Sequence, residues 1–502
     1  MKIRGVFNRC TGAAAIVAAF LAAAPSASLA QSTTSADAQK KIDALTKQLA
    51  EMQKQQAQIM SQMQEMKKQM DVKAVADAQA AAAAAASPNA APSPAAPQTV
   101  AEHVNTIESD ISGIRKDLAT NLGVHIHGLM DAQYEHNFDN PGVQGVDKVN
   151  NYRAFDVDPS SFTFQQFQLH LDRTVDGGVG FVADINFGKV AEQLHLATHY
   201  SNNQGTSTEE VDPTQAYLTY TIPVGSGINL SAGKYVTLLG AEVIPTYNNL
   251  NYNISQGLLF TLGEPLTHTG VRANYAFTDK IALTLGVNNG WDDPADNNDG
   301  KSIEGELSLT PTSSLTMLLN GTYGPEQANH GNSKLGAIDP VITYKTPIPG
   351  LQLIGEYLYA HEDGPVVPAI TPIAGPNSPN PLVGVPSVNH GVDWQGFAGY
   401  IVYDVNDKWE LATRGEYFRD SDGIRSGIRQ SLGEVTLTST YKITDALWIR
   451  SEYRHDESNA SPFFTNRSNV YPPINDQNGA TPGSIYTISG QDTLATALIY
   501  TF

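Results

Sequence analysis

Histidines and aspartates at alternating positions are the side chains of this sequence best suited to chemistry. They are His125, His127 and His170 with Asp131, Asp172 and Asp184. In an extended segment, residues two positions apart lie on one face, so His125 and His127 could offer two imidazoles to one metal ion. Histidines on a wet polar wall need no such role, and no serine accompanies them in a recognisable motif. We therefore expect no catalytic residue, no metal and no cofactor, and keep a barrel enzyme as the less favoured alternative.

Arginines and carboxylates also alternate along the C-terminal half. The positions are Arg272, Glu410, Arg414, Glu416, Arg450, Glu452 and Arg454. Segment 236–268 differs, because it is moderately apolar and has no Lys or Arg, with Glu242 and Glu264 as its only carboxylates. A loop directed into solvent would be more hydrophilic. If the charged positions line a channel, this segment can fold into it as a constriction, with both glutamates facing the arginines across a transverse field.

Strands must position these residues. From residue 121 onward polar and apolar residues alternate, which predicts β-strands, and we count sixteen up to residue 502. Tight-turn sequences such as Asp176-Gly177-Gly178 alternate with longer polar connections such as 361–390 and 455–489. Strict alternation of short and long connections is typical of an all-β transmembrane barrel of antiparallel strands, with the short turns in the periplasm.

The last strand supports a closed barrel. Leu498, Tyr500 and Phe502 share one face of a segment that ends the chain. In a soluble sheet such a strand would be an exposed, aggregation-prone edge. In a closed barrel it pairs with the first strand, and its apolar face contacts outer-membrane lipid.

The N-terminus is typical of a secretory signal peptide, assigned to residues 1–30. Lys2, Arg4 and Arg9 precede an apolar run at 12–24, which is followed by a small-x-small cleavage pattern. No apolar run of about 18 residues follows, so no transmembrane helix is predicted. Cys10 is the only cysteine, so the mature chain has none.

Charge is concentrated in the predicted barrel. Residues 121–502 hold 19 basic and 41 acidic residues, a net charge near −22. Such acidity argues against nucleic acid as a partner.

A heptad seam predicts a coiled coil at residues 31–71. Its core positions are Ile42, Leu45, Leu49, Met52, Gln56 and Ile59. An Ala/Pro-rich linker follows at 72–99, and a short helix is predicted at 100–120. We expect this α-helical region to lie in the periplasm and to form a homo-oligomer, with a trimer favoured, and it could also reach peptidoglycan.

Four short runs resemble a known family, the OmpL-like β-barrel porins. They are Thr269–Ala273, Gly286–Asp292, Asp296–Asn298 and Gly324–Glu326. The resemblance covers roughly 121–502 and implies a pore. It also implies that Leu498, Tyr500 and Phe502 are read by the barrel-assembly machinery. Phosphate-selective porins likewise carry an N-terminal coiled coil, but they need a Lys/Arg-rich constriction that segment 236–268 lacks.

The sequence therefore predicts an outer-membrane porin for passive diffusion of small hydrophilic solutes, with a preference for cations. Three alternatives stay open. They are a channel specific for phosphate, other anions or sugars, a barrel enzyme that uses the His/Asp cluster, and a structural tether to the cell wall.

Overall fold

The computed structural model describes residue 113 and residues 123–141, 149–174, 178–197, 210–328, 330–366, 388–465 and 486–502. The predicted signal peptide, coiled coil and linker lie outside these residues, as does the short helix apart from residue 113. They stay predictions.

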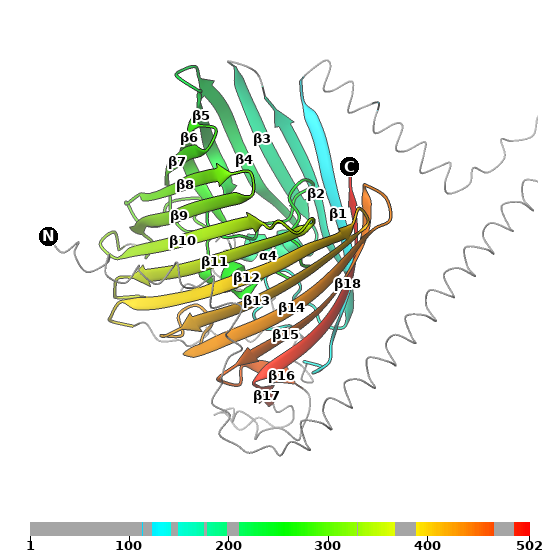
Figure 1. Ribbon diagram of the computed structural model, residues 1–502. Coiled ribbons are helices and arrows are strands. Elements are labelled where there is room, and N and C mark those ends of the chain that lie inside the picture. The colour runs from blue at the N-terminus through cyan, green and yellow to red at the C-terminus, as the bar shows by residue number, and fades with distance from the viewer. Residues whose placement is uncertain are drawn as a thin grey trace, which may run out of the picture. The chain divides into compact units, whose positions relative to one another are not determined.

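The described residues form a barrel of antiparallel strands (Figure 1). The barrel strands are β1 (His125–Asn137), β2 (Ser161–Arg173), β3 (Val179–Phe187), β4 (Val211–Ile222), β5 (Ile228–Val236), β6 (Thr267–Thr278), β7 (Ile281–Asn288), β8 (Ser302–Thr312), β9 (Leu315–Pro325), β10 (Lys334–Lys345), β11 (Leu351–Glu362), β12 (Val392–Asn406), β13 (Trp409–Asp420), β14 (Gln430–Lys442), β15 (Leu447–Ser458) and β18 (Gly490–Thr501). Each pairs with its neighbours in the chain, and β18 closes the ring against β1. The predicted sixteen-stranded antiparallel barrel is thereby confirmed.

Side-chain alternation decides which face of each strand is outside. In β13, Trp409, Leu411 and Tyr417 are exposed, whereas Arg414 and Phe418, on the other parity, are buried. Successive side chains of a strand point to opposite faces, so this period turns Trp409, Leu411 and Tyr417 outward and Arg414 and Phe418 inward.

Closure depends on the C-terminal strand. Leu498 pairs with Ala132 and Tyr500 with Met130 in the β1–β18 register. Phe502 extends the pairing, because it and Gly128 exchange two backbone hydrogen bonds of 2.9 and 3.0 Å. A side chain at residue 128 would collide with the Phe502 ring, so glycine is required there. The placement of Leu498 and Tyr500 on the outward face agrees with a lipid contact, which stays a prediction, as does recognition by the assembly machinery.

Short and long connections alternate around the ring. Four or five residues join β4 to β5, β10 to β11 and β14 to β15, and two residues join β6 to β7 and β8 to β9. Longer connections lie at the other end of the barrel, and two of them hold the helix α4 (Lys189–Ala197) and the small sheet of β16 (Phe463–Thr465) and β17 (Tyr486–Ile488). None of the helices in the described ranges is both long and apolar enough to span a membrane.

Candidate functional site

The connection from β5 to β6 corresponds to the predicted constriction, and we call residues 237–266 the inserted loop. In the ring of sixteen strands, β5 and β13 are eight strands apart and so lie on opposite sides. Glu242 of the inserted loop nevertheless contacts Arg414 of β13, with 2.6 Å between Oε1 and Nη1. The inserted loop therefore crosses the inside of the barrel.

Arg414 anchors the crossing point. Its side chain is 0% exposed. Besides Glu242, it pairs with Glu434 of β14 at 2.9 Å and donates to the carbonyl oxygen of Ser255 at 2.7 Å. Hydrogen bonds between charged groups are roughly twice as strong as neutral ones, and a buried arginine is tolerated only when its charge and donors are satisfied in this way.

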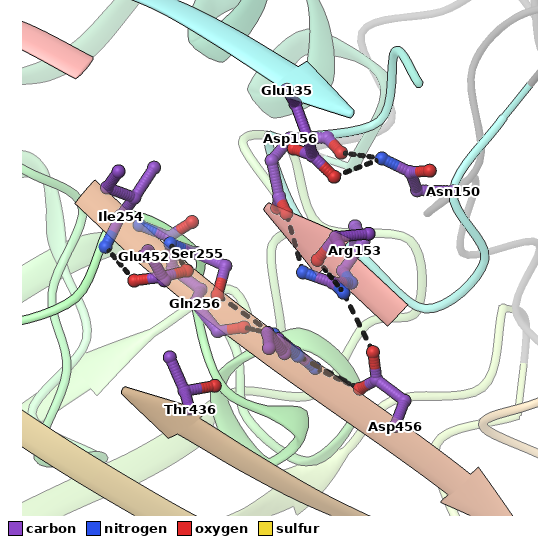
Figure 2. Close-up of polar contacts among 12 residues, drawn as sticks. Glu135, Asn150, Arg153, Asp156, Ile254, Ser255, Gln256, Thr436, Glu452 and Asp456 are labelled. Carbon is purple, nitrogen blue, oxygen red and sulfur yellow. Dashed lines mark hydrogen bonds and ion pairs between the residues drawn. The ribbon is translucent and has the colours of Figure 1, made fainter. Parts of the chain in front are cut away.

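Three alternating inward residues of β15 hold the backbone of the inserted loop, and Figure 2 shows one of them, Glu452, beside Ile254 and Ser255. The residues of β15 are Arg450, Glu452 and Arg454. Arg450 Nη1 donates to the carbonyl of Asn251 at 2.8 Å, and Arg454 Nη1 donates to that of Gln256 at 2.5 Å. Between them, Glu452 accepts the N–H of Ser255 at 2.9 Å. The wall thus supplies hydrogen-bond partners that an irregular buried backbone needs.

A second segment, residues 149–157 between β1 and β2, contacts the same wall (Figure 2). Arg153 donates to Asp156 and to Asp456 of β15, each at 2.8 Å. Asn150 Nδ2 donates to Glu135 of β1 at 2.6 Å. Sequence reasoning missed Arg153, because strand periodicity assigns no face to a loop residue. The i,i+3 spacing of Arg153 and Asp156 was the available hint.

Apolar contacts complete the attachment of the inserted loop. It contains the short π-helix η2 (Leu259–Gly263), all of it buried. Leu259 and Leu262 share a buried cluster with Trp394 of β12 and Phe418 of β13. Trp394 also donates its Nε1–H to the carbonyl of Gly263 at 3.0 Å. Each buried leucine contributes about 1.5–3 kcal/mol relative to an exposed one. The apolar character that suggested insertion from the sequence therefore corresponds to buried packing, on the wall for Leu259 and Leu262 and against α4 and segment 149–157 for Ile244 and Phe260.

The two glutamates of the inserted loop do not project into the open lumen. Glu242 is 5% exposed and Glu264 is 4% exposed. Glu242 is drawn to Arg414 and also accepts the N–H of Gly257 at 2.6 Å. Burial, followed by the neighbouring carboxylate of Glu356, raises the pKa of Glu264 well above its ordinary value. Of the two glutamates expected to face arginines, Glu242 therefore does so at Arg414, whereas Glu264 is enclosed beside other carboxylates, and their role in a constriction stays a prediction.

Other wall residues have different surroundings. Arg272 of β6 pairs with Glu304 of β8 at 2.9 Å, and its guanidinium lies 4.0 Å from the centre of the Tyr235 ring. Glu416 of β13 accepts backbone N–H groups of the inserted loop. Glu410 of β13 has an inward parity and is partly exposed, and the described residues offer it no ion pair.

Four members of the histidine and aspartate cluster, His125, His170, Asp172 and Asp184, pair with one another, whereas Asp131 is partly buried and lies apart from these pairs. His170 Nδ1 lies 2.6 Å from Asp184 Oδ1, and its Nε2 lies 3.5 Å from Asp172 Oδ1. His127 stacks on Tyr247 of the inserted loop, with ring centroids 4.3 Å apart and planes at 4°. His125 contacts Asp172 at 3.2 Å. Because both nitrogens of His170 face carboxylates, the cluster fits a polar wall better than a metal centre.

The part of the wall away from β10–β15 has polar residues that stay partly exposed. These inward residues are Tyr217, Thr219, Ser231, Asn274, Glu306 and Ser308. They lie on β4, β5, β6 and β8, whereas the apolar contacts of the inserted loop involve β11–β13. The accessible inner surface is therefore hydrophilic.

The chain is similar to several solved outer-membrane structures at low identity. OmpT of Vibrio cholerae is 14% identical, covering 76% of this chain and 97% of that one, with a TM-score of 0.44. The anion-selective porin of Comamonas acidovorans is 10% identical (76% and 99% covered, TM-score 0.45). OprB of Pseudomonas putida is 11% identical (78% and 97% covered, TM-score 0.47). No protein of curated function matches the chain.

A family model decides the assignment. The model described as "Putative beta-barrel porin-2, OmpL-like" matches residues 123–502, which is the whole barrel. The resemblance seen in the sequence is confirmed, and the chain belongs to the OmpL-like β-barrel porins of the outer membrane.

Proposed function

We propose that this porin lets small hydrophilic solutes diffuse passively across the outer membrane and that the inserted loop is its constriction. The observation that supports this most directly is the crossing of the loop from β5 to Arg414 on the opposite side of the ring. A sixteen-stranded barrel is wide enough for an aqueous channel, and a segment fixed across its interior narrows it. The hydrophilic wall on β4–β8 supplies the remaining lining.

We propose that the channel prefers cations, and that carboxylates of the barrel wall, not Glu242 and Glu264 of the inserted loop, cause this preference. Residues 121–502 have a net charge near −22. Glu306 and Glu410 are inward and partly exposed, and neither has an ion pair with any described residue. Arg272, on the same side as Glu306, is neutralised by Glu304. These two accessible carboxylates support the preference, although Lys442 of β14 lies near Glu410 on the same inward face.

Reversal potentials in planar bilayers under a KCl gradient test the preference. We expect wild-type channels to prefer K⁺, and Glu306→Gln with Glu410→Gln to shift the reversal potential toward zero. The shift should shrink as salt rises, because the Debye length falls from about 30 Å at 0.01 M to about 10 Å at 0.1 M. Glu457→Gln, which removes an exposed carboxylate of β15 on the outward parity, is the matched control. A preference for chloride would overturn the proposal.

Liposome swelling tests the constriction independently of charge. Neutral sugars of increasing size should enter at falling rates up to a sharp limit. Deleting residues 246–256, the part of the inserted loop that contacts β2, β14 and β15, should move that limit to larger sugars. An unchanged limit would mean that another part of the chain narrows the channel.

We further propose that the N-terminal region lies in the periplasm and that its coiled coil joins chains into a homo-oligomer, with a trimer favoured. The heptad seam from Ile42 to Ile59 supports this, because one isolated helix cannot bury it. Contact with peptidoglycan would be a second use of the same region.

A further inference from the structure

Three carboxylates meet where the end of the inserted loop reaches the wall. Glu264 belongs to the loop, Asp339 to β10 and Glu356 to β11. All three are at least nine-tenths buried. One oxygen from each can be chosen so that all lie within 4.8 Å of one another.

Each carboxylate has a buried oxygen that no N–H or O–H donor of the described residues reaches, although Glu264 and Glu356 can share a proton with each other. These atoms are Glu264 Oε2, Asp339 Oδ1 and Glu356 Oε1. The second oxygens of the two wall residues are fixed from the loop, since the N–H of Gly240 donates to Asp339 and that of Ala241 to Glu356 Oε2 at 3.1 Å. Gly240 has φ +94°, and a Cβ there would collide with the Glu264 carboxylate. The backbone is thus shaped around the three acids and orients them toward one another.

In the part of the chain that the structure describes, no positive side chain pairs with these three carboxylates. None of the ion pairs among the described residues includes Glu264, Asp339 or Glu356, although Arg414 and Arg272 are paired with other glutamates. Removing one carboxylate from water costs several kcal/mol, and mutual repulsion adds to that cost. The cluster must therefore be neutralised either by protons or by a bound cation.

We propose that the cluster formed by Glu264, Asp339 and Glu356 binds a Ca²⁺-like divalent cation that fastens the inserted loop to β10 and β11. Carboxylate oxygens are the ligands that Ca²⁺ takes at 2.3–2.6 Å, so two oxygens sharing one ion are at most about 5.2 Å apart. The separation of up to 4.8 Å meets that limit. Mg²⁺, with bonds of about 2.1 Å, allows at most about 4.2 Å and demands near-ideal octahedral geometry, so it suits three irregularly placed carboxylates less well. Ca²⁺ also accepts irregular geometry, with water completing its 6–8 ligands.

The site would complement the ion pair between Glu242 and Arg414 of β13, which lies on the same side of the ring as β10 and β11. Glu242 near the start of the inserted loop is held by Arg414, whereas Glu264 near its end has no cationic side chain as a partner. A cation between Glu264 and the wall would fix the loop at both ends. This inference does not depend on which solutes the channel passes.

Binding can be measured directly on the full-length protein in detergent, free of lipopolysaccharide and stripped with EDTA. Tb³⁺ is a suitable probe, because Trp394 donates to Gly263, the residue beside Glu264, and can sensitise its luminescence. We expect one Tb³⁺ per chain, displaced by Ca²⁺ and less readily by Mg²⁺. Trp394→Phe should lose most of the sensitised emission while still binding Ca²⁺ in a calorimeter.

Stability gives a second readout. If the unfolded chain does not bind, Ca²⁺ at 100 times its Kd raises the ratio of folded to unfolded protein about 100-fold. The heat-dependent gel shift of the barrel, in EDTA and in Ca²⁺, measures this difference within each variant. Glu264→Gln, Asp339→Asn and Glu356→Gln should each weaken Ca²⁺ binding by at least the roughly 10-fold that loss of even an outer-sphere partner causes.

Glu452→Gln is the matched control. Glu452 is also a buried wall carboxylate that accepts backbone N–H groups of the inserted loop, but it lies outside the cluster. Its variant should keep the full response to Ca²⁺. Wild-type protein that binds neither Tb³⁺ nor Ca²⁺, with equal stability in EDTA, would overturn the proposal and leave protons as the neutralising agent. A response that persists in all three cluster variants would also overturn it.

Discussion

Arg414→Gln is the substitution with the largest expected effect on the inserted loop. It removes the ion pairs with Glu242 and Glu434 and the donor to the carbonyl of Ser255. Glutamine is too short to span from β13 to the loop and carries no charge. The loop would lose its principal polar contact with the side of the barrel opposite its origin.

The expected loss of unfolding free energy follows from the two glutamates that lose Arg414 as their partner. Glu434 keeps a hydrogen bond from Thr436 and a weaker contact with Arg454 at 3.7 Å. Glu242, 5% exposed, keeps the N–H of Gly257. Breaking a buried ion pair on one side typically costs about 3–5 kcal/mol, since an unpaired charge stays buried. That is about two to four orders of magnitude in the ratio of folded to unfolded protein.

Two assays measure the result. Urea titration followed by the gel mobility of the folded barrel gives the change in free energy of unfolding. Single-channel recording reports the loop itself, and we expect larger and noisier openings when its attachment is weakened. Arg419→Gln, at an exposed outward position of the same strand, should change the free energy of unfolding by no more than about 0.5 kcal/mol.

A double variant separates the ion pair from other effects. Adding Glu242→Gln to Arg414→Gln removes the buried charge that Arg414→Gln leaves unpaired. The double variant should therefore lose less unfolding free energy than the sum of the two single variants, by about 1–3 kcal/mol. Additive losses would mean that the two residues act independently. If Arg414→Gln unfolds at the same urea concentration as wild type and gives the same channel record, Arg414 does not hold the loop.

Three other predictions concern regions outside the lumen. Removing Phe502 should lower the yield of folded barrel, because two backbone hydrogen bonds to Gly128 are lost at the closing seam; unchanged heat-modifiable yield would contradict this. Deleting residues 31–99 should leave the barrel folded but reduce its mass in analytical ultracentrifugation, and an unchanged mass would exclude the coiled coil as the link. Burial, and then Glu326, raise the pKa of Asp293 to about 8 from 3.8, so the folded connection after β7 holds a proton that the unfolded chain has released. Its local stability should therefore fall as pH rises from about 4 to 8. In Asp293→Asn, hydrogen exchange of that connection should lose this slope.

The barrel could be predicted from the sequence because one local rule governs it. A period of two places Arg414, Glu416 and Arg450 on the inward face whatever the rest of the chain does. Turn residues then mark where each strand ends, and the even strand count follows. The final strand could be recognised for the same reason, since Leu498 and Tyr500 belong to the apolar set.

The contacts inside the barrel could not be predicted in this way. Glu242 and Arg414 are 172 residues apart, and the partners of Arg450 and Arg454 are loop carbonyls about 200 residues away. Backbone carbonyls occur at every position, so the sequence carries no sign of which ones an arginine will bind. The burial of Glu264 beside Asp339 and Glu356 likewise depends on how the loop folds back.

The contacts of the inward arginines argue against an anion channel. This structural argument is stronger than the one available from the sequence. A phosphate or anion site needs basic groups with free donors, and three inward arginines, Arg414, Arg450 and Arg454, stood as candidates. In the described part of the barrel all three are buried and bind carbonyls or carboxylates of the inserted loop or the wall. Their guanidinium groups bind the inserted loop and the wall, and the inserted loop contains no Lys or Arg of its own. An anion would have to displace those contacts, each worth about 1.5–3 kcal/mol, before it met a free guanidinium. The accessible carboxylates of Glu306 and Glu410 would meanwhile repel it, which supports the proposed preference for cations.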